Sequence, residues 1–308
     1  MGIITKGYQK SFLIRYDKDP AIPYFSIDDF PGMKVDARTF NNSHGDTIHY
    51  FFYNYESPKQ NIVALFLPGM GPGHTAYFAE INALCKAGYK VLTLDYTGCG
   101  ESSGKTMYSC NAPTRDVDEL LNLLDLKDEI VVIGHSLGGY TALNIVNMRK
   151  DIKKAVVISG FLSIANEMLS ATKSHLVAWR VKKFEEKLIP EYGKLDNIEY
   201  LINTKDQILY IQSDDDAMVA FKYALGIVKE LGNPNIKCLE LHGKYHNPLY
   251  TYDAVNYMIE VFSEYNRLIK DKTLDTVEKR IEFMSDKSIE KMTEIDQEVF
   301  KHILDFIK

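Results

Sequence analysis

The chain contains 308 residues, of which 45% are hydrophobic and 25% are charged, the proportions of an ordinary globular protein rather than a disordered or fibrous one. Its 36 basic and 42 acidic residues leave a net charge of -6, so the basic surface expected of a nucleic-acid-binding protein is missing. The four cysteines have neither the spacing of a zinc site nor the density of a disulfide scaffold. We therefore expect no nucleic-acid partner and no metal.

Membrane and export signals are also missing from the sequence. The apolar runs are all much shorter than the roughly 20 residues with which a helix crosses a bilayer. Residues 1–20 lack the apolar core of a signal peptide. We expect a cytoplasmic protein without integral membrane contact.

The expected strands begin with an antiparallel hairpin, because residues 34–40 and 47–55 flank a turn-rich spacer at 42–46. From residue 61 to residue 270, short apolar runs then alternate with helix-like segments, which is typical of a mainly parallel sheet covered by helices. The hairpin is expected at the edge of this sheet. The later runs are nearly all apolar, as expected of strands buried on both faces, and cover residues 61–67, 90–95, 129–134, 154–159, 207–212 and 236–242.

One connection is unusually long, because about 45 residues separate the strand that ends near Ser159 from the strand that begins at Gln207. Scattered apolar residues over 162–188, including Trp179, predict a small helical insertion there. A helical insertion at this point of a sheet is either a lid over a substrate or additional packing, and we favour the lid. The insertion is expected to span about residues 161–205 of one α/β domain at 1–270.

Beyond residue 270, apolar residues recur at helical spacing in a tail of 38 residues, 271–308. We expect helices that pack on the body of the protein or at an interface. The same apolar stripe would suit a contact between two copies, so a homo-oligomer stays open.

The most informative motif is the run Gly134-His135-Ser136-Leu137-Gly138, a G-x-S-x-G that directly follows a predicted strand and precedes a helix-like segment. A turn from strand to helix over so few residues forces a strained backbone at Ser136, and glycine is needed on either side because larger residues would collide. We predict that Ser136 is a nucleophile. The alternative is a plain glycine-rich turn.

A serine hydroxyl is a poor nucleophile near neutral pH, so it needs a base that is itself oriented by an acid. His246 lies on a loop after the last predicted strand, at the sheet edge where sites of parallel sheets gather, and is the favoured base. His242, at the end of that strand, is the competitor. For the acid, Asp214-Asp215-Asp216 follow the strand at 207–212. We favour Asp216, at the N-cap edge of a helix expected to begin with residues 217–219, and Asp215 is the runner-up.

Together these motifs resemble an α/β-hydrolase over roughly residues 35–265, in the family order of nucleophile, acid and histidine. The segment 213–219 is similar to the family's glycine-x-x-Asp-x-x-Val, with Ser213 in place of glycine. Residues 95–102 resemble its structural Asp-x-Arg-Gly-x-Gly-x-Ser loop without the arginine. The resemblance implies an α/β-hydrolase fold with a short helical cap after the sixth strand, and it is closest to the monoacylglycerol-lipase and serine-aminopeptidase-like branch.

The resemblance also implies an oxyanion hole. Leu67-Pro68-Gly69-Met70-Gly71 is similar to the family's His-Gly-x-Gly loop, with Pro68 in place of histidine. The hole would consist of the backbone N–H groups of Met70 and Leu137. We predict acyl transfer from a small-molecule ester or acyl substrate, without a cofactor, with peptidase or amidase action as the alternative.

Two readings from other classes stay open. Residues 99–106 are one residue short of a phosphate-binding G-x-x-x-x-G-K-[ST], but Cys99 stands where the first glycine is needed and Pro113 follows too soon. A non-catalytic binding protein on the same fold is the second rival. Labelling of Ser136 by a fluorophosphonate separates an enzyme from a binding protein.

Overall fold

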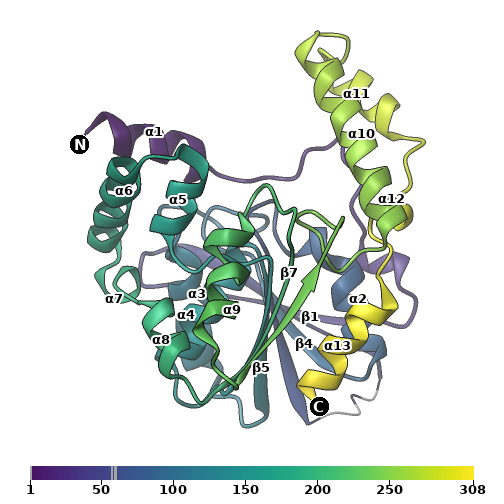
Figure 1. The fold of residues 1–308 in the computed structure, drawn as a ribbon. Coiled ribbons are helices and arrows are strands. Elements are labelled where there is room, and N and C mark those ends of the chain that lie inside the picture. Colours follow the sequence, from purple (N-terminus) through teal and green to yellow (C-terminus); the bar gives the residue numbers. More distant parts are fainter. Residues whose placement is uncertain (1, 57, 59–60) are drawn as a thin grey trace.

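The computed structural model describes residues 2–56, 58 and 61–308 (Figure 1). Its centre is one eight-stranded sheet in the order β1-β2-β4-β3-β5-β6-β7-β8. The strands are β1 (Lys34–Asn41), β2 (Thr47–Asn54), β3 (Ile62–Leu67), β4 (Lys90–Leu94), β5 (Glu129–His135), β6 (Lys154–Ile158), β7 (Gln207–Ser213) and β8 (Ile236–Leu241). Strands β3 to β8 pair in parallel, and β1 and β2 add an antiparallel hairpin at one edge. The predicted α/β fold is confirmed.

The inner parallel strands β3 to β7 are buried over almost their whole length, which agrees with their apolar sequences. For β8 the prediction of burial on both faces is wrong. β8 is the edge strand beyond β7, and Lys237, Cys238 and Glu240 are exposed on it. The polar residues in its sequence were a sign of this edge position, because an edge strand with charged side chains resists pairing with other chains.

Helices cover both faces of the sheet, as Figure 1 shows. The apolar sides of α3 (Ala112–Leu124), α4 (Leu137–Met148) and α9 (Leu225–Leu231) belong to the core of one face. Those of α2 (Phe78–Lys86), α10 (Tyr252–Lys270) and α13 (Gln297–Ile307) belong to the core of the other. Short 3-10 helices stand at Ile27–Asp29, His74–Tyr77 and Phe221–Tyr223. None of the helices in the described ranges is long and apolar enough to span a membrane.

The predicted helical insertion after the sixth strand is confirmed. It consists of α5 (Ile164–Thr172), α6 (His175–Leu188), α7 (Pro190–Gly193) and α8 (Asn197–Asn203). Side chains of Ser163, Ser174 and Asp196 cap the N-termini of α5, α6 and α8. We call α5 and α6 the cap. An additional helix, α1 (Ile3–Phe12), packs against α6 at the outer side of the cap (Figure 1).

The C-terminal segment runs over the opposite side of the molecule. Helices α10, α11 (Val277–Met284) and α12 (Ile289–Met292) enclose a small apolar cluster of their own, and α10 and α11 project beyond the sheet (Figure 1). The chain then returns to the body through α13. Its buried residues are Val299, Phe300, Ile303, Phe306 and Ile307, and they complete the core of the second face.

Candidate active site

Ser136 stands on the sharp turn between β5 and α4, with φ 55° and ψ −118°. This is a left-handed backbone that residues other than glycine rarely adopt, so the surrounding structure must hold it in place. A Cβ on Gly134 would overlap the backbone of Gly138, and one on Gly138 would overlap the Leu67 carbonyl. These contacts explain the two glycines of the motif. The Ser136 side chain is half-buried at the carboxyl end of the sheet.

The three consecutive aspartates have three different partners. The carboxylate of Asp214 lies 2.7 Å from Nδ1 of His242, on the surface. The Asp215 carboxylate accepts hydrogen bonds from the Ser213 hydroxyl at 2.6 Å and from the Tyr245 N–H at 3.1 Å. Only Asp216 reaches His246. Ser213 stands where the family segment has glycine. Its hydroxyl bonds to the Asp215 carboxylate, which also accepts from Tyr245, so Ser213 helps to hold the loop of the aspartates against the loop of His246.

The Asp216 carboxylate is fully buried and accepts from Nδ1 of His246 at 2.9 Å and 3.1 Å through its two oxygens. The N–H groups of Met218 and Val219 donate to its Oδ1 at 2.9 Å and 3.0 Å. The expectation that a helix begins with residues 217–219 is wrong, because these residues form turns and the next helical residues are those of Phe221–Tyr223. The carboxylate closes a local turn in the way that it would cap a helix, which explains the misleading pattern.

An ionised carboxylate only accepts hydrogen bonds, so the contact with Asp216 fixes the proton of His246 on Nδ1 and leaves Nε2 as an acceptor. The loop around His246 is held by Lys244, a buried residue with 1% side-chain exposure. Its Nζ bonds to the Tyr250 carbonyl and lies 2.7 Å from the Asp296 carboxylate in the segment ahead of α13. The histidine is thus oriented by its own acid and by the anchoring of its loop.

His135, the residue before Ser136 in the chain, contacts His246. The rings of His135 and His246 lie 4.8 Å apart between their centroids. Among the described residues, no hydrogen bond joins the Ser136 hydroxyl to His246. The structure therefore brings the predicted acid, Asp216, and the predicted base, His246, into contact. The predicted nucleophile, Ser136, directly follows His135, whose ring packs near that of His246.

A chain of hydrogen bonds runs through His135. The Gly69 N–H donates to the Tyr77 hydroxyl at 2.9 Å, and this hydroxyl lies 2.9 Å from Nδ1 of His135. On the other side, Nε2 of His135 lies 2.8 Å from the His246 carbonyl oxygen. A carbonyl only accepts, so Nε2 carries the proton and Nδ1 accepts from Tyr77. Burial, together with nearby His246, lowers the pKa of His135 to about 3, which keeps the ring neutral.

Ser136 opens into a mostly apolar pocket of about 270 Å³. This volume is near the lower end of ligand sites, which hold about 300–1,000 Å³, so the pocket suits a small acyl group. The pocket is lined by Phe12, Met70, Cys110, Ser136, Leu137, Phe161, Ile164, Glu167, Met168, Ala171, Met218 and Val219. Its one ionisable carboxyl group belongs to Glu167 on α5, and burial, with a smaller effect of Asp216, raises the pKa of Glu167 to about 7.

The predicted oxyanion residues Met70 and Leu137 line the same pocket as Ser136. The loop of Met70 is pressed against the turn of Ser136, since a Cβ on Gly69 would lie 3.2 Å from the Ser136 Cβ. In the part of the chain that the structure describes, neither the Met70 N–H nor the Leu137 N–H donates to a protein acceptor. Both donors are therefore available to a bound group.

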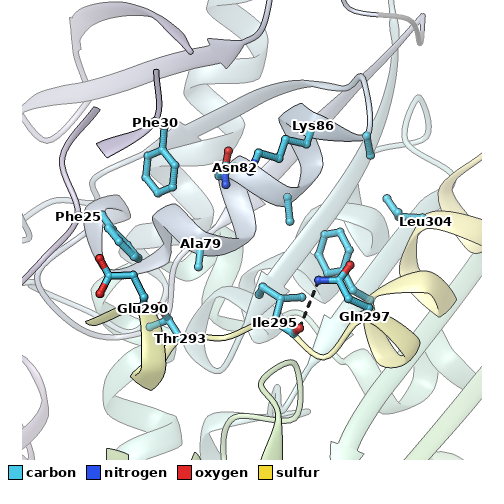
Figure 2. Close-up of a pocket in the computed structure, with 13 residues that line it drawn as sticks. Phe25, Phe30, Ala79, Asn82, Lys86, Glu290, Thr293, Ile295, Gln297 and Leu304 are labelled. Atoms are coloured by element: carbon cyan, nitrogen blue, oxygen red, sulfur yellow. Dashed lines mark hydrogen bonds between the residues drawn. The ribbon is translucent and has the colours of Figure 1, made fainter. Parts of the chain in front are cut away.

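A larger hollow of about 470 Å³ lies elsewhere, between α2, the segment of Phe25 and Phe30, and the C-terminal segment (Figure 2). Figure 2 shows Lys86 and Asn82 on its α2 side and Glu290 and Thr293 on the other. None of its lining residues is a histidine, a cysteine or a serine. It contains none of the predicted site residues and has no pair of nucleophile and base.

The comparison with known proteins assigns the chain to a family. Residues 57–254 match the family described as serine aminopeptidase, S33, and the chain belongs to this family of α/β-hydrolases. The fold agrees with a Pyrococcus furiosus esterase, with a TM-score of 0.57 and 19% identity over 85% of this chain and 97% of that one. A Pyrococcus horikoshii acylaminoacyl peptidase gives a TM-score of 0.52 and 18% identity over 72% of this chain and 38% of the other.

Curated relatives match over shorter segments. A proline iminopeptidase of Saccharolobus solfataricus is 29% identical over 122 residues, 39% of each chain. The sn-1-specific diacylglycerol lipase ABHD11 of Mus musculus is 29% identical over 125 residues, 40% of each chain. The matches thus span about two fifths of the length of these relatives. The names of the family and of these relatives include peptidases and a lipase, which act on different substrates. The comparisons therefore assign the chain to a hydrolase family but do not identify its substrate.

Sequence reasoning did not find several residues of the pocket and its supports. Phe12 lies more than 120 positions before Ser136 and belongs to no motif, so nothing in the sequence connected it with the site. Glu167 was within the predicted insertion, but no pattern showed that it would face the pocket. His135 had a signal, because it stands beside the nucleophile at the end of a buried strand, where a polar residue needs partners.

Proposed function

We propose that the protein is a serine hydrolase that cleaves carboxylic esters through an acyl-enzyme, with Ser136, His246 and Asp216 as its catalytic residues. Nε2 of His246 takes the proton of the Ser136 hydroxyl as Oγ attacks the ester carbonyl carbon. The proton then passes to the leaving alcohol as the C–O bond breaks. Water, activated by the same histidine, releases the acid and restores Ser136. Asp216 holds the imidazole and stabilises its charged form.

The backbone N–H groups of Met70 and Leu137 are proposed to stabilise the oxyanion of each tetrahedral intermediate. Two fixed amides, one in the segment after β3 and one at the start of α4, would bind developing negative charge without reorganisation, and one such donor is worth about 3 to 4 kcal/mol in the transition state. Because the donors belong to the backbone, Pro68 in place of the family histidine does not remove them. The pocket beside Ser136 is proposed to receive the acyl group.

One observation carries this proposal: a buried Asp216–His246 pair, with Nδ1 to carboxylate distances of 2.9 Å and 3.1 Å, lies at the same sheet edge as a strained Ser136 that lines an apolar pocket. The test is labelling by a fluorophosphonate together with hydrolysis of p-nitrophenyl esters. We expect both in the wild type and neither in Ser136→Ala. In Asp216→Asn, turnover should fall by about 10⁴-fold because the imidazole loses its tautomer.

The competitor residues are the matched controls. Asp215→Asn and His242→Gln change neighbouring residues of the same loops whose side chains do not contact His246. Activity should persist in both variants. If either of them lost activity as completely as Ser136→Ala while His246→Gln remained active, the assignment of acid and base would be wrong.

Glu167 favours a second candidate, the hydrolysis of aminoacyl esters or amides. A carboxylate in an apolar pocket beside Ser136 would pair with the amino group of such a substrate. Glu167→Gln should then lower turnover of aminoacyl p-nitroanilides, with the largest loss above pH 7, where the wild-type carboxyl is ionised. Turnover of neutral esters should not fall. Faster wild-type turnover of anilides than of esters would place this candidate first.

A further inference from the structure

The N-terminal helix α1 forms part of the pocket that holds Ser136, although it lies outside the segment 57–254 that matches the family. Phe12, its last residue, lines the pocket together with Ile164, Met168 and Ala171 of α5. The remaining walls come from the loops and the turn around Ser136. An aromatic side chain brought from the start of the chain thus limits a cavity otherwise made by the sheet and the cap.

Polar contacts hold α1 in position. The Tyr8 side chain is buried, and its hydroxyl lies 2.7 Å from Oε1 of Glu185 on α6 and 2.9 Å from the Cys110 Sγ. The Tyr8 ring stacks on Phe12 at 5.6 Å and meets Phe184 edge-on at 6.4 Å between centroids. One face of Phe12 is therefore supported by a tyrosine that is itself fixed at both its hydroxyl and its ring. Its position is set by the protein and not by a ligand.

The chain after α1 is fastened to the loop that follows β4. Arg15 donates to the carbonyls of Ser102 and Gly104 at 2.9 Å and of Gly100 at 3.0 Å. Tyr16 pairs with the same loop through backbone bonds with Gly98 and Gly100. Terminal segments fray unless such bonds hold them. Phe12 is thus anchored on both sides, by Tyr8 before it and by residues 15 and 16 after it.

The anchored segment also reaches the loop of the proposed oxyanion donor. The Tyr16 hydroxyl lies 3.0 Å from the Met70 Sδ. Met70 in turn lines the pocket. Phe12 of α1 thus lines the cavity itself, and Tyr16, in the segment that follows α1, contacts Met70, another lining residue.

We propose that Phe12 sets the acyl specificity of the enzyme by closing one end of the acyl pocket, so that the wild type prefers short acyl chains. The inference rests on the proposed esterase function. Its physical basis is steric, because a fixed aromatic ring limits the room for methylene groups. In a hydrophobic pocket, one methylene group of the substrate that the pocket accommodates or excludes changes kcat/KM by about tenfold or more.

The test compares p-nitrophenyl acetate, butyrate and octanoate in Phe12→Ala, Phe12→Leu and Phe12→Trp. The ratio of kcat/KM for octanoate to that for acetate should rise by about tenfold or more in Phe12→Ala, rise less in Phe12→Leu and fall in Phe12→Trp. Trp179→Ala is the matched control, since it removes an exposed aromatic ring from α6 of the cap that does not line the pocket. Its ratio should equal that of the wild type.

The outcomes separate the two proposals. Wild-type hydrolysis with the same chain-length profile in all three Phe12 variants overturns the role of Phe12 and leaves the esterase proposal standing. A wild type that neither hydrolyses an ester nor reacts with a fluorophosphonate overturns the esterase proposal itself. If Phe12→Ala does not fold, the opposite shifts of the Leu and Trp variants decide, and a shift of equal size in Trp179→Ala would count against the inference.

Discussion

The Tyr77 hydroxyl connects two loops that the proposed reaction needs at once. It accepts from Gly69, beside the proposed oxyanion donor Met70, and donates to His135, beside Ser136. His135 then donates to the backbone of His246. The direction of all three bonds is fixed, because an amide begins the chain and a carbonyl ends it. These groups position the reacting residues and take no part in proton transfer.

Tyr77→Phe should therefore lower kcat with little change in KM. The variant leaves the Gly69 N–H and Nδ1 of His135 buried without a partner, which costs about 1 to 3 kcal/mol of stability for each group. A small shift of the loops should lower kcat by up to about 100-fold. Steady-state kinetics and urea unfolding measure the two effects. Tyr55→Phe, which breaks a hydrogen bond to Asn82 at 2.9 Å instead, should leave kcat unchanged.

Glu80 should make the stability of the protein depend on pH. The side chain is 3% exposed, and its Oε1 accepts from the Tyr250 hydroxyl at 2.7 Å, while Oε2 has no partner among the described residues. Burial raises the pKa of Glu80 from 4.5 to about 7. Between these values the folded protein binds more protons than the unfolded chain. The free energy of unfolding therefore falls as pH rises through this interval, by at most about 3 kcal/mol.

In Glu80→Gln this contribution to the pH dependence should disappear. Urea unfolding at pH 5 and pH 8 should show a smaller loss of stability in the variant than in the wild type. The variant should be the more stable of the two at pH 8. Glu260→Gln, on the exposed part of α10, is the control and should change neither value. Equal losses in Glu80→Gln and the wild type would show that Glu80 ionises normally in the folded protein.

Single residues of the site could be predicted from the sequence where the local backbone geometry restricts which residues fit. Ser136 between two glycines was recognisable because the strained turn requires small neighbours on both sides. The choice of Asp216 over Asp215 was not certain from sequence, because it depends on how two loops fold toward each other. Nor could sequence indicate the raised pKa of Glu80, which results from burial by segments distant in the chain.

Helix α6 of the cap is joined to the body through one buried carboxylate. Glu185 accepts from the Tyr8 hydroxyl at 2.7 Å, the Cys110 N–H at 3.3 Å and the Asn111 side chain at 3.1 Å, and it also bonds to the Ser109 hydroxyl. Burial raises the pKa of Glu185 despite these donors. The carboxylate therefore links three elements: the cap, α1 and the loop before α3.

Removing this carboxylate should loosen the cap. In Glu185→Ala the four donors lose a shared acceptor, and we expect a loss of about 3 kcal/mol in the free energy of unfolding. The rate of cleavage within 173–188 by a protease should rise as well. Glu186→Ala, which removes the ion pairs of a partly exposed carboxylate with the exposed Lys182 and Lys183, should cost less than about 1 kcal/mol. An unchanged cleavage rate in Glu185→Ala would mean that packing alone holds α6.

Strands and helices could be predicted from the sequence wherever their burial requires a recognisable pattern of apolar residues. The central strands follow from runs of apolar residues, and the hairpin follows from its turn. The prediction failed for β8, whose edge position depends on the strand order, and for residues 217–219, where a side chain bonds to a turn. The packing of α1 could not be predicted from the sequence, because the apolar face of α1 packs against α6, which lies 160 positions or more away in the chain.

At the scale of the molecule, the C-terminal segment holds the loop of His246. The segment of Ile295 bridges Tyr250, and backbone bonds join Thr251 to Glu294 and Asp296 to Leu249. The Lys244–Asp296 ion pair adds to these contacts. α13 then packs its apolar face into the core of the sheet. The extension beyond residue 270 therefore supports the site from the side opposite the cap.

Asp296→Asn should weaken both stability and turnover. It leaves the buried Lys244 ammonium without an anionic partner, for which the expected loss is about 3 to 5 kcal/mol. A displaced His246 loop should then lower kcat toward p-nitrophenyl esters. Asp305→Asn breaks an exposed ion pair between α13 and Lys308, the residue after this helix, and should cost no more than about 1 kcal/mol. Unfolding curves and kinetics on both variants measure the difference.

The two partners of each of these contacts are synthesised at different times, which has a consequence for folding during synthesis. Tyr8 leaves the ribosome long before Glu185 exists to bind it, and Lys244 is made before Asp296. A nascent chain that has already exposed Ser136 would thus hold neither a closed acyl pocket nor a fixed imidazole. On the proposed function, hydrolytic activity should therefore appear only after Asp296 has been synthesised and has paired with Lys244.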